Sequence, residues 1–136
     1  MLSRLGARVR FVGPRTLMPS VTAKLPAKVY YDLRTGIEGA DVVMCLRLQR
    51  ERMEDGHVGS VGEYARLYQI SRQMLRHAAP EAIVMHPGPI NRGVELDDAV
   101  ADGGQSVILE QVKNGIYAKT AALAWSIGDL AGRAQA

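Results

Sequence analysis

The sequence of 136 residues has one cysteine, few aromatic residues and no long uninterrupted apolar run. Because Cys45 stands alone, an internal disulfide and a structural metal site built from several thiolates are both excluded, and a reducing cytoplasm is the expected compartment. No stretch approaches the roughly 20 apolar residues that a membrane span needs, and no signal-peptide pattern opens the chain. These absences predict a soluble, cytoplasmic protein with no membrane partner.

Runs of one charge sign are also missing. The 17 Lys and Arg residues are interspersed with 14 Asp and Glu residues, for a net charge of +3, and this diffuse pattern argues against nucleic acid as a partner. No glycine-rich phosphate-binding motif follows a predicted strand, which disfavours a nucleotide-binding module. The composition, 47% hydrophobic and 23% charged, is that of a folded domain, and the length fits one domain over residues 1–136.

Alternating short strands and helices predict an α/β fold with a parallel sheet flanked by helices on both faces. The run Val42–Leu46 is apolar without alternation, which predicts a strand buried on both faces. Met1–Leu5 followed by Gly6 resembles the last turn of a helix closed by a glycine cap, so we expect an upstream segment to be missing. Strands are expected at 7–13, 29–31, 42–46 and 82–85, and helices at 32–38 with Asp32 as N-cap, 63–69, 71–79 and 105–130.

Two strand ends carry candidate binding residues, since ligands of open α/β sheets collect where strands end. After the third strand, Arg47 and Gln49 are two residues apart, so in an extended segment both side chains point the same way. A guanidinium fork beside a neutral amide suits a carboxylate ligand. The alternative is that Arg47 makes an ordinary surface ion pair and Gln49 faces water.

After the fourth strand comes His86-Pro87-Gly88-Pro89. The two prolines remove backbone donors and fix φ, while Gly88 permits geometry closed to other residues. Such a turn offers carbonyl oxygens to an ammonium or amide ligand, and together with Arg47 and Gln49 it suggests an α-amino acid. The alternative is a stiff turn with His86 as a packed capping residue. Either proline could follow a cis peptide bond.

Three long segments closely resemble the second domain of bacterial aspartate carbamoyltransferases, within the aspartate/ornithine carbamoyltransferase family. They are VVMCLRLQRERM at 42–53, VMHPGPINRGVEL at 84–96 and VADGGQSVILEQVKNGIYAK at 100–119. Ornithine-specific relatives carry a His-Cys-Leu-Pro turn and a Ser-Met-Gly loop at the corresponding places. The resemblance implies a Rossmann-like aspartate-binding domain and L-aspartate as the acceptor of a carbamoyl group in pyrimidine synthesis, with no metal or organic cofactor.

Carried over by position, the resemblance implies that Arg47 and Gln49 hold the aspartate carboxylates. It also implies that the turn formed by His86, Pro87, Gly88 and Pro89 meets the amino and carbamoyl groups as the catalytic segment. Glu51 and Arg52 would belong to a loop that closes over substrate. Lys119 stands where relatives usually carry Arg, which keeps the charge and loses the planar fork.

The motifs with which the family binds carbamoyl phosphate do not occur in this sequence. The expectation is therefore a partial aspartate-binding domain, inactive alone, that meets carbamoyl phosphate only through a missing domain or a partner chain. A homo-oligomer or a complex with other pyrimidine-pathway subunits is the expected assembly. The alternative function is a non-catalytic companion or scaffold subunit that docks onto a pyrimidine-pathway enzyme.

Overall fold

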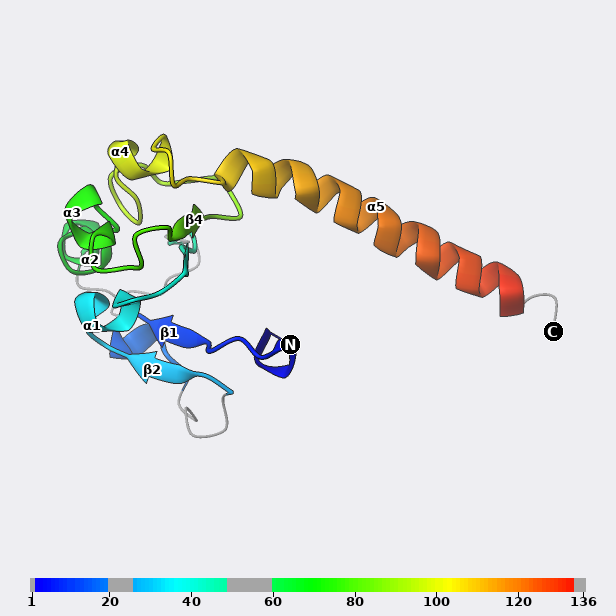
Figure 1. Cartoon of the computed structure of the whole chain (residues 1–136), viewed down its shortest axis with the longest axis horizontal. Helices are drawn as coiled ribbons and strands as arrows, with labels where there is room; N and C mark the ends of the chain where they lie inside the picture. The colour runs from blue at the N-terminus through cyan, green and yellow to red at the C-terminus, as the bar shows by residue number, and fades with distance from the viewer. Residues whose placement is uncertain (1, 20–25, 49–59, 134–136) are drawn as a thin grey trace.

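The computed structural model describes residues 2–19, 26–48 and 60–133 of the chain. Four short strands and several helices alternate along these residues, and the long C-terminal helix extends away from the body of the molecule (Figure 1). Within the described residues the strands form two parallel pairs, β1 with β2 and β3 with β4. The predicted fold class, α/β with parallel strands, is confirmed.

The first pair is built from β1 (Arg10–Val12) and β2 (Lys28–Tyr30), and α1 (Leu33–Ile37) packs against it. A Cβ added at Gly36 would lie 2.5 Å from a methyl of Val12, so glycine is what lets the helix approach the strand this closely. Two 3-10 turns, η1 (Leu2–Leu5) and η2 (Arg15–Leu17), flank β1.

Helix α1 begins and ends with specific polar contacts. The Asp32 carboxylate accepts a hydrogen bond from the Thr35 amide at 2.9 Å, which confirms Asp32 as the N-cap and holds the pKa of that carboxyl below its usual range. At the other end the Arg10 guanidinium donates to the carbonyl oxygens of Gly36 and Glu38. A cation at a helix C-terminus satisfies carbonyls that the helix leaves unpaired.

The second pair consists of β3 (Val42–Met44) and β4 (Ile83–Met85) in register. Side chains alternate across it: Val43 and Val84 are buried, whereas Val42 and Met44 are half exposed. The prediction that residues 42–46 are buried on both faces is therefore wrong, because in the part of the chain described here only one face of this strand is covered.

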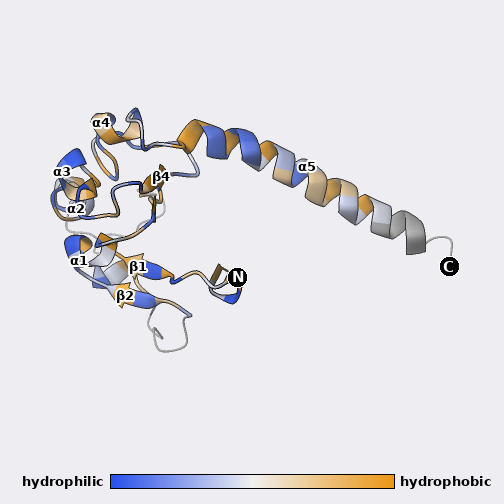
Figure 2. Cartoon of the chain, viewed as in Figure 1, coloured by the Kyte–Doolittle hydropathy of each residue, from blue (hydrophilic) through white to orange (hydrophobic). Residues whose placement is uncertain are grey.

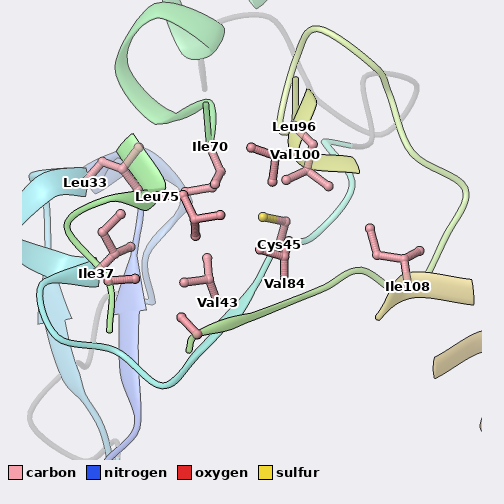
Figure 3. Packing of buried hydrophobic residues seen from close by; sticks show 12 residues of the cluster. Leu33, Ile37, Val43, Cys45, Ile70, Leu75, Val84, Leu96, Val100 and Ile108 are labelled. Carbon is pink, nitrogen blue, oxygen red and sulfur yellow. The ribbon is translucent and has the colours of Figure 1, made fainter. Parts of the chain in front are cut away.

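The buried face of the second pair packs into the main hydrophobic core (Figure 3). Leucine and isoleucine side chains from α1 and from the segments around α3 (Arg72–Leu75) and α4 (Asp98–Ala101) close over it. Leu96 and Val84 have no exposed surface. The core also includes Leu33, Ile37, Val43, Cys45, Ile70, Leu75, Ala78, Ala82, Val100 and Ile108.

The remaining helices are α2 (Val61–Tyr68) and α5 (Ile108–Arg133). Of the α5 side chains that the structure describes, Ile108 in the first turn belongs to the core, whereas apolar side chains farther along the helix are exposed. Figure 2 shows apolar residues recurring along this extended helix. Ile116, Leu123 and Ile127, which lie within the helix predicted at 105–130, are each more than 60% exposed. None of the described helices is long and apolar enough to cross a membrane.

Most elements lie where the sequence predicted them, although their bounds differ: β1 and β3 are shorter than predicted, and α5 is shifted three residues toward the C-terminus. The glycine cap at Gly6 is confirmed, since Ala7 N donates to Leu2 O and Gly6 N donates to Ser3 O, the bonding pattern of a Schellman motif. Predicted helix 71–79 is only one turn, begun by the Ser71 cap. Helix α4 was missed, because four residues hold too little periodicity to detect.

Candidate functional site

Parallel pairing brings the two candidate segments to the same edge of the structure. Strands β3 and β4 run side by side in the same direction, and Cys45 N donates to Met85 O one residue beyond the ladder. The segment holding Arg47 and the turn that begins at His86 therefore leave the sheet together. The two strand ends that carry the candidate residues thus lie next to each other.

The turn at residues 86–89 is rigid and faces outward. Pro87 and Pro89 are exposed, Gly88 is half-buried with a φ of 69°, a value that glycine tolerates best, and the Gly88–Pro89 peptide bond is cis. His86 is the exception, because its side chain is fully buried beneath the turn. The interpretation of His86 as a packed residue within a stiff turn thus describes its position.

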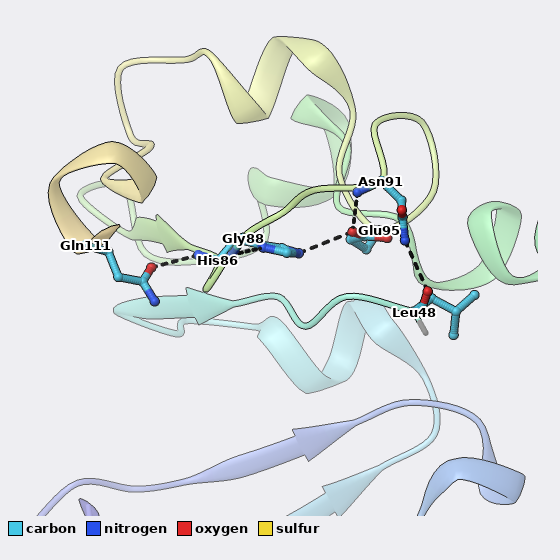
Figure 4. A network of polar contacts seen from close by, with 6 residues as sticks. All are labelled: Leu48, His86, Gly88, Asn91, Glu95 and Gln111. Carbon is cyan, nitrogen blue, oxygen red and sulfur yellow. Dashed lines mark hydrogen bonds and ion pairs between the residues drawn. The ribbon is translucent and has the colours of Figure 1, made fainter. Parts of the chain in front are cut away.

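Every backbone N–H of this turn is already used. The His86 amide donates to Gln111 Oε1 at 2.9 Å, and the Gly88 amide donates to His86 Nδ1 at 2.9 Å (Figure 4). Pro87 and Pro89 have no N–H. Within the described residues no backbone amide donates to a carbonyl oxygen of residues 86–89. The turn can therefore offer hydrogen-bond acceptors to a ligand, but no backbone N–H donors.

A side-chain hydrogen bond ties the turn to the Arg47 segment. Asn91 Nδ2 donates to Leu48 O at 3.1 Å, directly after half-buried Arg47 (Figure 4). This contact fixes the two strand ends relative to each other. Gln49, the predicted companion of Arg47, and Glu51 and Arg52, the predicted loop residues, lie outside the described residues, so their placement stays a prediction.

Three residues that support the turn were not singled out from the sequence: Glu95, Asn91 and Gln111. Glu95 is 2% exposed, and its Oε1 accepts from the Asn91 amide at 2.6 Å and contacts His86 Nε2 at 3.2 Å. A detectable signal existed, because a carboxylate between Val94 and Leu96 in an apolar stretch needs a buried partner. Gln111 had no such signal, since it reads as an ordinary polar position of a helix.

Arg92 is a further cation of this region, and it forms ion pairs with two aspartates. Its guanidinium donates to Asp98 at 2.8 Å and to both carboxylate oxygens of Asp102, also at 2.8 Å. These bonds raise the pKa of Arg92 and lower that of Asp102. Arg92 thus braces the segment that follows the turn against α4.

Burial controls the electrostatics beneath the site. Removal from water, with the Glu95 carboxylate nearby, raises the pKa of the Cys45 thiol to about 12. Burial likewise raises the pKa of Tyr64 to about 12. Both groups are therefore uncharged near neutral pH. Among the described residues no three His, Cys, Asp or Glu side chains are grouped closely enough to hold a metal ion.

The Cys45 thiol should be almost inert in the folded chain. At pH 8 its thiolate fraction is about three orders of magnitude below that of an unperturbed cysteine, and only the thiolate reacts. We expect Ellman's reagent to label the native chain at least about a thousandfold more slowly than the chain in guanidinium chloride. The native rate should rise roughly tenfold per pH unit as long as the fold persists. Equal native and denatured rates would contradict burial of this residue.

A parallel α/β domain with polar groups gathered where neighbouring strands end is a ligand-binding class of fold. Residues 1–126 match the family described as aspartate/ornithine carbamoyltransferase, Asp/Orn binding domain. The chain belongs to this family.

Its curated relatives include aspartate carbamoyltransferase catalytic subunits. The one from Bradyrhizobium diazoefficiens is 51% identical over 123 residues, and the one from Sorangium cellulosum is 53% identical over 123 residues. These alignments cover 90% of this chain but 39% and 38% of the respective relatives. The chain thus spans less than half the length of the relatives it matches.

Solved structures of the family superpose on the chain. An ornithine carbamoyltransferase from Gloeobacter violaceus gives a TM-score of 0.75 at 25% identity, covering 90% of this chain and 43% of that one. An aspartate transcarbamoylase from Trypanosoma cruzi, in complex with carbamoyl aspartate and phosphate, gives 0.64 at 25% identity, covering 80% and 36%. The fold is thus shared by members named for either amino acid.

Proposed function

We propose that this chain supplies the amino-acid-binding part of a carbamoyltransferase that transfers the carbamoyl group of carbamoyl phosphate to the amine of L-aspartate. The observation that carries the proposal is the acceptor-only turn at residues 86–89 beside the Arg47 segment. The turn can accept hydrogen bonds from N–H groups, and the Arg47 cation beside it can bind a carboxylate. Those are the two polar ends of an amino acid.

The reaction needs positioning more than chemical groups. The aspartate amine attacks the carbonyl carbon of carbamoyl phosphate, the bond from that carbon to the bridging oxygen breaks, phosphate leaves, and the amine loses a proton. In this proposal, carbonyl oxygens of Pro87, Gly88 and Pro89 receive the N–H groups of the amine and of the carbamoyl amide. Holding the amine close to the carbonyl carbon in the correct orientation supplies much of the rate enhancement of such a reaction.

Aspartate is favoured over ornithine as the acceptor. Arg47 would hold a second carboxylate, which aspartate has and ornithine lacks, whereas a side-chain ammonium next to a guanidinium would be repelled. The curated relatives named above, at 51% and 53% identity, are aspartate enzymes. Gln49 is proposed to assist Arg47, and no cofactor or metal is required by the chemistry.

Carbamoyl phosphate would bind mainly outside this chain. The relatives are more than twice as long as the segment matched here, so the electrophile site is proposed to come from a further domain or from a partner chain. Exposed apolar side chains on β3 and α5 support an assembly in which this surface is covered. A cytoplasmic, pyrimidine-synthesising setting fits this proposal.

Domain replacement tests the proposed function. The matching 39% of the Bradyrhizobium relative is exchanged for this chain, and formation of N-carbamoyl-L-aspartate is measured with both substrates. We expect turnover by the chimera and none by the isolated chain. L-Ornithine serves as the control acceptor and should give no product. A folded chimera that uses ornithine, or neither acceptor, would contradict the proposal.

The exposed apolar surface also favours a second candidate, a non-catalytic companion subunit. Ile116, Leu123 and Trp125 are among the large apolar side chains that α5 leaves exposed. In that case the chain would bind a complete carbamoyltransferase and alter its activity without contributing a site. An inactive but folded chimera, together with stable binding of the chain to the intact relative, would select this candidate.

A further inference from the structure

The buried pair of His86 and Glu95 lies directly beneath the turn and has not been assigned a role. His86 is 0% exposed and Glu95 is 2% exposed, which makes them the buried polar side chains of the described core. Burying a carboxylate and an imidazole is costly unless their hydrogen-bonding groups are satisfied. Because burial of these two polar side chains is costly, their position next to the candidate site suggests a specific role.

The hydrogen bonds around His86 are compatible with one tautomer. Gly88 N–H points at Nδ1 from 2.9 Å, so Nδ1 has no proton and accepts. Nε2 lies 3.2 Å from Glu95 Oε1, which can only accept as a carboxylate, so Nε2 carries the proton and donates. The opposite tautomer would set donor against donor at Gly88 and acceptor against acceptor at Glu95. The contact is thus a hydrogen bond from a neutral ring and not an ion pair.

The position of Glu95 is itself fixed from a second direction. The Asn91 amide donates to the same oxygen, Oε1, at 2.6 Å, while the Asn91 side chain holds Leu48 O. Glu95 therefore orients the ring of His86 from a point anchored to both strand ends (Figure 4). The chain of contacts runs from Leu48 through Asn91, Glu95 and His86 to Gly88.

We propose that Glu95 is a positioning residue that locks His86 in the Nε2–H tautomer and thereby keeps the Gly88 amide turned away from the ligand. The proposal rests on the proposed function, since it assigns a purpose to the acceptor-only surface of the turn. Without the lock, the ring can turn or change tautomer, and Gly88 N–H is released. The free N–H of Gly88 would then lie beside the carbonyl oxygens of the turn. There it would face the N–H groups of the ligand, and two hydrogen-bond donors in contact repel each other.

The test reads the tautomer of His86 and the protection of Gly88 in the isolated chain, without ligand. Long-range proton–nitrogen NMR on histidine-labelled chain reports which ring nitrogen is protonated, and His57→Gln and His77→Gln variants assign the signals. We expect Nε2 protonated and Nδ1 unprotonated. Glu95→Ala should lose the single tautomer and speed exchange of the Gly88 amide about tenfold, the change that corresponds to one ordinary hydrogen bond.

Glu95→Gln is the matched control, because its amide oxygen can still accept from His86 Nε2 and from the Asn91 amide. It should keep the Nε2–H tautomer and the protected Gly88 amide. An Nδ1–H ring in the wild-type chain would overturn the proposal, and so would a Glu95→Ala chain that keeps both signatures. If Glu95→Ala does not fold, the wild-type and Glu95→Gln spectra still decide. No ligand is involved, so these spectra do not depend on whether the chimera is active.

Discussion

Replacing Leu96 by Ala is expected to lower the free energy of unfolding by about 3 kcal/mol, within the range of roughly 2 to 5 kcal/mol for buried Leu to Ala changes. Leu96 has no exposed surface and lies in the main core, so the deletion leaves a cavity that rigid neighbours fill only partly. Natural domains hold only about 5 to 15 kcal/mol of stability, so the loss is a large share of the total. Urea unfolding followed by circular dichroism measures it.

Met44→Ala is the matched control, because Met44 is a large apolar residue of comparable size that is 51% exposed. Surface substitutions are usually within about 0.5 kcal/mol of neutral. We therefore expect the Met44→Ala chain to unfold at nearly the wild-type urea concentration, with an unchanged slope. A Met44→Ala loss as large as that of Leu96→Ala would mean that the open face of β3 is covered in solution, for example by a second copy of the chain.

The contrast between these two residues marks where the sequence was informative. An apolar run without alternation predicted a strand correctly, because β-branched residues such as Val42 and Val43 are enriched in strands. It could not predict that Val43 is buried while Met44 is exposed, since burial depends on which other elements lie over each face. The continuous apolar run remains consistent with a strand that is covered on both faces once a further domain or partner is present.

The candidate site likewise has a part that the sequence predicted and a part that only the structure revealed. Proline and glycine act through their own backbone geometry, so the stiff, carbonyl-presenting turn at Pro87 and Gly88 was predictable. The residues that hold it are spread along the chain: Glu95 is 9 residues from His86, and Gln111 is 25 residues from it. Their roles follow from three-dimensional packing and could not be predicted from spacing. The turn was thus predicted, and the support of Glu95 and Gln111 beneath it was found in the structure.

Arg47→Ala is expected to have the largest effect on activity in the domain-replacement enzyme. Loss of a charge-assisted hydrogen-bonded pair costs about 1.5 to 3 kcal/mol, so kcat/KM for L-aspartate should fall roughly 10- to 150-fold. The loss should fall mainly on the KM for aspartate, because a carboxylate remote from the reacting carbon is held in the ground state as well. The KM for carbamoyl phosphate should change little. Steady-state assays with each substrate varied in turn measure both.

One further variant separates the planar donor geometry of Arg47 from its charge, and a second variant serves as a matched control. Arg47→Lys keeps the cation but loses the planar pair of donors, so its kcat/KM should lie between those of wild type and Arg47→Ala. Arg76→Ala removes an exposed arginine at the end of α3 and should leave both constants near wild type. Circular dichroism melts establish that each variant is folded. If Arg47→Ala matched Arg76→Ala in kcat/KM, Arg47 would be the ordinary surface cation that its spacing alone also allowed, and the carboxylate would have to be held by another residue.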